Sequence, residues 1–124
     1  MNISSILQLL SEKNVAILFA LVMSNMLFNI LANASFKLSA GSATVVSFIA
    51  WQVIGNLAGF ITVITLTAML KAIPLSIAFP LTSGLAVIGV QVLGAYFLFH
   101  EPISLAKWAG TLLITFGIIL IGGK

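Results

Sequence analysis

Four long apolar runs, separated by short polar connections, constrain this chain more than any other feature of its sequence. A helix needs about 20 apolar residues to cross the roughly 30 Å hydrocarbon core of a bilayer, and each run is long enough. Backbone polar groups inside a bilayer must be bonded within the protein, so helices are the expected form. The sequence therefore predicts an all-α membrane protein with four transmembrane helices, at residues 15–36, 44–70, 75–99 and 104–121.

The distribution of charge agrees with this interpretation. Charged residues make up 6% of the chain and hydrophobic residues 61%, whereas soluble domains carry about 25% charged residues. The charges lie at or near the ends of the predicted spans: Glu12, Lys13, Lys37, Lys71, Glu101, Lys107 and Lys124. No basic cluster marks a nucleic-acid surface, and the chain has no cysteine for a disulfide or a thiolate metal site. We expect no nucleic acid, metal or cofactor to bind.

Residues 1–13 precede the first span and follow a different pattern. Apolar residues recur there at helical spacing with polar residues between them: Ile3, Ile6, Leu7 and Leu10. This spacing is typical of an amphipathic helix that lies in the membrane interface. We therefore divide the chain into an interfacial segment, residues 1–13, and a single four-helix transmembrane domain, residues 14–124.

The orientation of the chain in the membrane is weakly marked. The connections between spans are short, so neighbouring helices are expected to be antiparallel and both termini to lie on one side. Lys13, Lys71 and Lys124 fall on the side of the termini, and Lys37 and Lys107 on the other. This excess indicates cytoplasmic termini, but one fixed orientation and insertion in both orientations remain open.

Polar residues repeat every four positions in the first span: Asn25, Asn29, Asn33 and Lys37. On a helix this spacing makes one stripe about 18 Å long. A buried amide without a partner costs a few kcal/mol, so the stripe should face other helices or a hydrated cavity rather than lipid. It either joins the helices by hydrogen bonds or forms a wall of a substrate path. Lys37 either reaches the lipid headgroups or offers its charge to a phosphate.

The second and third spans supply candidate neighbours for this stripe. Gln52 and Asn56 lie one helical turn apart, and we predict that they bond the amides of the first span. Pro80, near the start of the third span, is expected to kink that helix because proline removes a backbone donor.

Glycines in the fourth span indicate a close helix contact. Gly110 and Gly117 are seven residues apart and so share a helix face. Together with Leu113 and Ile114 they predict a helix–helix seam, because small residues let two backbones approach closely.

The sequence lacks the residues that several kinds of transport and catalysis require. No carboxylate lies within a predicted span, whereas a proton-coupled transporter normally uses a titratable group inside the membrane. His100 and Glu101 do not form a zinc-protease motif, because Ser104 occupies the position of the second histidine. No nucleophile–base set is recognisable either, so we do not expect an enzyme.

Three segments carry a resemblance to a known group of proteins. They are A-I-P-L-S-I-A-F-P at residues 72–80, H-E-P-I-S at residues 100–104 and W-A-G-T-L-L-I-T-F-G-I-I-L-I-G at residues 108–122. In order and spacing they resemble the four-helix branch of the drug/metabolite transporter superfamily, over about residues 15–122. The resemblance implies a bundle of the small-multidrug-resistance type.

Two groups within that branch are similar to this chain. The small multidrug resistance family works as an antiparallel dimer through a seam like the one predicted in the fourth span, and exchanges protons for cationic drugs. Its essential first-helix glutamate aligns with Asn29, and its third-helix tyrosine and tryptophan align with Phe79 and Thr82. The resemblance therefore implies the fold and the dimer without the residues of drug–proton antiport.

The second group is the pair of small subunits proposed to flip undecaprenyl-phosphate-linked aminoarabinose. Those proteins carry Gln-x-x-x-Lys near the end of the first helix, where this chain has Asn33 and Lys37. They also carry Ala-Tyr-Pro at the start of the third helix, where this chain has Ala78-Phe79-Pro80, and a turn similar to residues 100–102. This resemblance implies a lipid-linked substrate that bears a phosphate.

These features favour a transporter or flippase subunit of a bacterial inner membrane, acting as a homodimer or as a heterodimer with a paralogous small subunit. The expected substrate is a small or lipid-linked molecule of the polyprenyl-phosphate type. The residues assigned to its path are Asn25, Asn29, Asn33, Lys37, Gln52, Asn56, Phe79, Pro80 and Thr82. The alternatives are an exporter of organic cations and a non-transporting accessory subunit of a membrane complex.

Overall fold

The computed structural model describes residues 2–122, and the side chains of those residues apart from 7 and 9–13. The described elements are α1 (Ile3–Ala40), α2 (Val45–Met69), α3 (Leu75–Gly89), the π-helix η1 (Val90–Leu98) and α4 (Leu105–Gly122). η1 continues α3 without a break, so α3 and η1 form one rod. Four helical segments are long and apolar enough to cross a membrane: Asn14–Ala40, Val45–Met69, Leu75–Leu98 and Leu105–Gly122. The predicted all-α architecture of four spans is confirmed.

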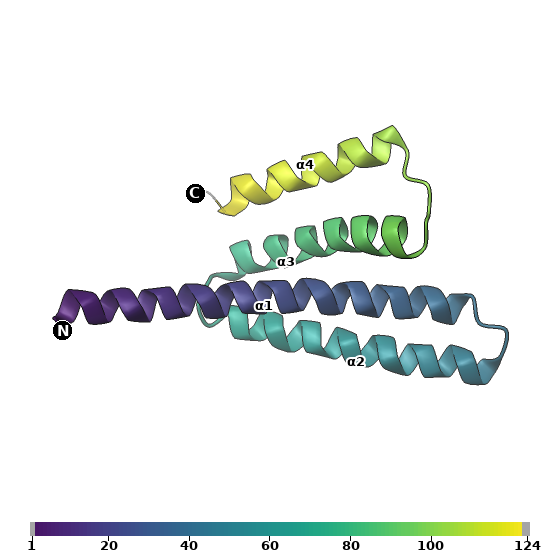
Figure 1. Cartoon of the computed structure of the whole chain (residues 1–124), viewed down its shortest axis with the longest axis horizontal. Coiled ribbons are helices and arrows are strands. Elements are labelled where there is room, and N and C mark those ends of the chain that lie inside the picture. The colour runs from purple at the N-terminus through teal and green to yellow at the C-terminus, as the bar shows by residue number, and fades with distance from the viewer. Residues whose placement is uncertain (1, 123–124) are drawn as a thin grey trace.

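The helices form an open row rather than a closed bundle (Figure 1). α1 lies between α2 and α3, and α4 lies beyond α3 and packs, within the described residues, only against the rod formed by α3 and η1. Helices that follow one another in the chain run antiparallel, whereas α1 and α3, which lie side by side, run in the same direction; the start of α1 and the end of α4 lie on the same side of the molecule. Much of the apolar surface is left uncovered by the chain itself, as expected for helices that face lipid or another protein.

α1 is one continuous helix that includes most of the predicted interfacial segment. Its first turns project beyond the other helices in Figure 1. The side chains of Leu7 and Leu10 lie outside the described part of the chain, so the interfacial position of this segment stays a prediction. At its other end α1 continues past the predicted boundary at Phe36 to Ala40, and Lys37 in the last turn favours this because a cation stabilises a helix C-terminus.

Local sequence signals set most of the helix starts. Asn2 Oδ1 accepts a hydrogen bond from Ser5 N at 2.9 Å, and Thr44 Oγ1 accepts one from Ser47 N at 3.1 Å. Both are N-caps, which satisfy backbone donors that have no partner in the first turn. α3 begins directly after Pro74 and passes through Pro80 in its second turn.

Small residues bring α3 close to both of its neighbours. A Cβ atom added at Gly89 would lie 3.0 Å from Met26 Cγ of α1, and one added at Gly84 would lie 2.5 Å from Ile118 Cδ1 of α4. α3 is therefore fixed between α1 and α4 by contacts that a larger side chain would obstruct.

Candidate functional site

The deepest member of the polar stripe on α1 joins that helix to α2. Asn25 is only 3% exposed, and its Nδ2 donates to Thr62 O at 2.8 Å and to Thr65 Oγ1 at 2.9 Å. These bonds satisfy an amide that would otherwise be costly inside a membrane. Of the two roles that the sequence left open for this stripe, Asn25 performs the structural one.

The next two amides are bonded along α1 itself. Asn29 Nδ2 donates to Asn25 Oδ1 at 3.0 Å, and Asn33 Nδ2 donates to Asn29 O at 2.9 Å. Neither bond uses a side chain of another helix. Both side chains also line spaces beside the third helical rod, which are described below.

The predicted partners of this stripe are wrong. Gln52 Nε2 donates to Ser39 Oγ at 3.2 Å, and Asn56 Nδ2 donates to Gln52 O at 2.7 Å. The register of the α1–α2 hairpin explains the difference, because Gln52 pairs near the turn while Asn25 lies deeper, opposite Thr62 and Thr65. Gln52 and Asn56 line neither of the cavities described next.

A small cavity of about 340 Å³ lies between α1, α2 and α3. Its lining includes four residues expected from the sequence, Asn25, Asn29, Phe79 and Thr82. Thr82 is 6% exposed and its hydroxyl donates to Ala78 O at 2.9 Å, so its hydrogen is already used within α3. Pro80 is not part of this lining.

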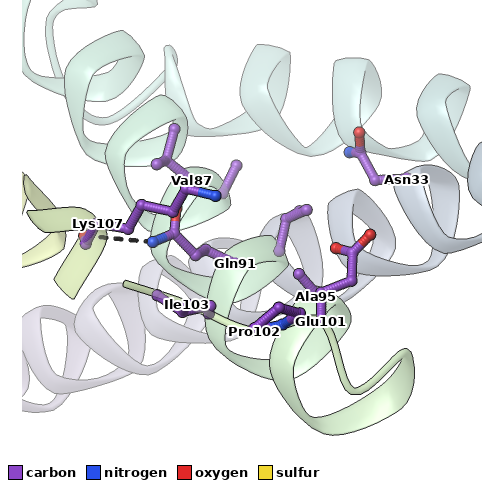
Figure 2. Close-up of a pocket in the computed structure, with 10 residues that line it drawn as sticks. Asn33, Val87, Gln91, Ala95, Glu101, Pro102, Ile103 and Lys107 are labelled. Atoms are coloured by element: carbon purple, nitrogen blue, oxygen red, sulfur yellow. Dashed lines mark hydrogen bonds between the residues drawn. The ribbon is translucent and has the colours of Figure 1, made fainter. Parts of the chain in front are cut away.

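A larger cavity of about 720 Å³ lies beside the first one, and Ala86 lines both. Its volume falls in the range of small-molecule sites, which is roughly 300–1,000 Å³. The polar residues in its lining are Asn33, Gln91, Glu101 and Lys107, which come from α1, η1, the connection before α4, and α4 (Figure 2). Of these, only Asn33 was assigned to the path from the sequence.

Gln91 and Lys107 are the main members of the site that sequence reasoning missed. Gln91 Nε2 donates to Thr111 Oγ1 at 2.9 Å and to Lys107 O at 3.4 Å, which ties η1 to α4. Figure 2 shows Gln91 between Lys107 and Glu101. An isolated amide in the middle of the third apolar run was the available signal, since such an amide needs a partner in a membrane.

The charge at the end of the stripe is also paired. Lys37 Nζ lies 2.8 Å from Glu101 Oε1, and the two side chains are 54% and 43% exposed. Glu101 lines the larger cavity and Lys37 does not. The sequence assigned Lys37 to lipid headgroups or to a phosphate and gave Glu101 no role.

The residues of the predicted fourth-helix seam divide into two groups. Leu113 is 71% exposed, and Gly110 and Gly117 have no atom of another element within 4 Å of an added Cβ. Ile114 instead turns towards Gly84 of α3, at 3.6 Å from its added Cβ. The first three residues lie on a face that the chain itself leaves open, and Ile114 helps to pack α3 against α4.

The two cavities lie next to each other beside α1, and Ala86 lines both. The three asparagines of the stripe supply amides on one wall, and Gln91 supplies another on the opposite wall. Lys107 and Glu101 line the larger cavity, and Lys37 lies outside the lining, where it is paired with Glu101. The arrangement suits a polar molecule with a net negative charge, because amides bond its hydroxyl groups and lysine binds phosphate as a point charge.

Over 55 residues the chain is 47% identical to a protein of Enterobacter sp. (strain 638) named "Probable 4-amino-4-deoxy-L-arabinose-phosphoundecaprenol flippase subunit ArnE". The match covers 44% of this chain and 50% of that relative, so the chain spans about half the length of the curated relative it matches. No solved structure matches the chain. The family model described as "Small Multidrug Resistance protein" matches residues 16–114, which is most of the sequence, and the chain therefore belongs to the small multidrug resistance family.

Proposed function

We propose that this chain is one subunit of a dimeric flippase that carries a lipid-linked, phosphate-bearing head group across a bacterial inner membrane. The single observation that carries the proposal is the 720 Å³ cavity, which brings Asn33, Gln91, Glu101 and Lys107 together from three separate helices and a connection. The amides and the ammonium group of Lys107, with Lys37 close by on Glu101, suit a sugar-like or phosphate head group, while the lipid tail stays in the bilayer. Membership of a family of membrane transport proteins, rather than of enzymes, supports this function.

The chain lacks the titratable group that an exchange of protons for cationic drugs needs inside the membrane. No carboxylate lies in the described part of the four spans, so a cation has no buried partner there and no buried group can exchange a proton. Asn29 occupies the middle of the stripe and cannot titrate. The similar Enterobacter protein is named as a probable flippase subunit for a phosphoundecaprenol-linked sugar. A substrate of that kind would place its phosphate near Lys37 and Lys107.

The dimer is part of the proposal because the row of helices is open. Within the described residues α4 contacts only α3 and η1, and no described residue covers its face carrying Gly110, Leu113 and Gly117. A second small subunit, identical or paralogous, packed on that face would add the missing wall of the route. Two such units of opposite orientation would give access from the two membrane sides in turn.

Transport in liposomes tests this function. The purified chain, alone or with a paralogous subunit from the same host, is reconstituted with a fluorescent polyprenyl phosphate, and loss of signal to a membrane-impermeant quencher reports flipping. We expect flipping by the unmodified chain and its loss in Asn33→Ala and Lys37→Ala. Lys71→Ala is the matched control, because Lys71 lies in the connection between α2 and α3, away from both cavities.

Two results would replace the proposal. Proton-driven uptake of an organic cation such as tetraphenylphosphonium, without flipping of the lipid, would make the chain a cation exporter. Recovery of the chain in a larger complex, with no transport of either compound, would make it an accessory subunit.

A further inference from the structure

Glu101 separates Lys37 from the larger cavity. The carboxylate lines that cavity, and it bonds Lys37 Nζ at 2.8 Å, whereas Lys37 is absent from the lining. Asn33, one helical turn before Lys37, does line the cavity, and Figure 2 shows the carboxylate of Glu101 directed towards it. An anion that enters the cavity therefore meets the negative charge of Glu101 before it can reach the lysine.

The backbone around Glu101 holds it in that position. η1 ends at Leu98, and His100 has a φ of 53°, a left-handed conformation that is unfavourable for residues other than glycine. Glu101 N donates to Ala95 O at 2.8 Å, which folds the connection back onto η1. The carboxylate is thus presented to α1 by a strained and internally bonded turn.

We propose that Glu101 is the resident counter-ion of Lys37 in the empty site, and that the phosphate of the substrate displaces it. This inference rests on the proposed function, and it assigns a specificity role to a residue outside the predicted path. Exposed ion pairs are weak, so a phosphate, which carries more charge and more acceptor oxygens than a carboxylate, competes effectively for the ammonium. Neutral head groups gain nothing by the exchange and leave the pair closed.

Displacement of Glu101 also loosens α4. Within the described residues α4 has no contact with α1 or α2, and the Lys37–Glu101 pair is the bond that ties the connection before α4 to α1. Once Lys37 holds a phosphate, the link between that connection and α1 is broken, and the connection and α4 stay bonded to η1 through Glu101 N–Ala95 O and Gln91–Thr111. Arrival of the correct head group is thereby coupled to a shift of the helix on which the partner subunit is proposed to pack.

Binding to variants of the full chain tests the counter-ion role. The probe is a polyprenyl monophosphate, titrated against the detergent-solubilised protein and measured by native mass spectrometry. We expect Glu101→Gln to bind the probe about two- to fivefold more tightly than the unmodified chain. The gain is small because the carboxylate that is removed forms only a weak, exposed ion pair with Lys37. Glu101→Asp keeps the charge and is the matched control, with no gain in affinity expected.

A double variant identifies the lysine as the target of the competition. In a Lys37→Ala background, Glu101→Gln is expected to leave the affinity unchanged, because the contested ammonium is gone. Unchanged or weaker binding by Glu101→Gln alone, in protein of normal helix content, would overturn the inference while leaving the proposed function intact. Failure of every form to bind the probe would overturn both.

Two further measurements complete the test. Inorganic phosphate at the same concentration as the lipid should not displace it, and displacement would contradict a lipid-borne phosphate in favour of the free ion.

The chain has no cysteine, so Ala43→Cys with Ala106→Cys allows spin labels to report the distance from the α1–α2 connection to α4. We expect this distance distribution to change when the probe is added to the chain with Glu101. The Glu101→Gln chain should show the changed distribution even without the probe. Identical distributions in all these states would refute the release of α4.

Discussion

Lys37 Nζ, in the last turn of α1, lies 2.8 Å from Glu101 Oε1, in the connection that leads to α4. The two residues are 64 positions apart in the chain, and this contact joins the ends of two helices that do not otherwise touch. Both side chains are about half exposed. A ligand can therefore replace one member of the ion pair, and the pair contributes little to the free energy of unfolding.

The first prediction follows from that exposure. Exposed ion pairs contribute about 0–1 kcal/mol, so Lys37→Ala and Glu101→Gln should each change the free energy of unfolding by less than about 1 kcal/mol. Unfolding in detergent with rising SDS, followed by circular dichroism, measures this. A loss of several kcal/mol in either variant would mean that the pair is structural and cannot be opened by a ligand.

The second prediction separates two members of the same stripe. Asn25→Ala should destabilise the fold by about 1–2 kcal/mol, because it removes the bonds to Thr62 O and Thr65 Oγ1 from a buried site. Asn33→Ala should change the free energy of unfolding by less than about 0.5 kcal/mol, because Asn33 is exposed and its amide bonds only the backbone carbonyl of Asn29 in the same helix. The same SDS unfolding assay applies, and equal losses in the two variants would contradict the distinction.

The third prediction concerns the contact between η1 and α4. Gln91→Ala and Thr111→Val each remove one partner of the 2.9 Å bond, and their effects on stability should be coupled by about 0.6 kcal/mol, a typical value for such bonds in membranes. A double-mutant cycle measures this coupling. Thr115→Val is the control, because Thr115 bonds only Thr111 O of its own helix, and it should show no coupling to Gln91.

The fourth prediction tests the close approach of α3 and α4. Gly84→Val should cost about 1–3 kcal/mol, because even a first added carbon would lie 2.5 Å from Ile118 Cδ1. Gly59→Val is the matched control on α2, where nothing lies within 4 Å of an added Cβ. A similar cost at both positions would show that helix propensity, rather than packing of α4, sets the effect.

The fifth prediction addresses the proposed dimer. Gly117→Leu should lower the dimer fraction at least about tenfold while keeping the helix content, because the added side chain fills a face that is open in the single chain. Chemical cross-linking in native membranes and native mass spectrometry report the fraction. Ala50→Leu adds one carbon atom fewer, on an exposed position of α2, and should leave the dimer fraction unchanged.

The helices themselves were predictable because their signals are local. A run of about 20 apolar residues has few stable forms in a bilayer, and short connections force neighbours to be antiparallel. The predicted first span ends at Phe36, one turn before the observed end at Ala40, because the charge of Lys37 marks the end of the apolar run in the sequence. A lysine is tolerated in a last helical turn, where it is favoured by the helix dipole.

The sequence by itself determined four membrane-spanning helices, their antiparallel order and the polar stripe on the first of them. Only the tertiary structure decided which atoms each polar side chain meets. Asn25 bonds Thr62 and Thr65 rather than Gln52 or Asn56, Gln91 reaches Thr111, and Lys37 reaches Glu101. These choices depend on the rotation and axial register of each helix against its neighbour, which small contacts such as Gly89 on Met26 set. A rotation by one residue, about 100°, would give the same spans and an entirely different set of partners.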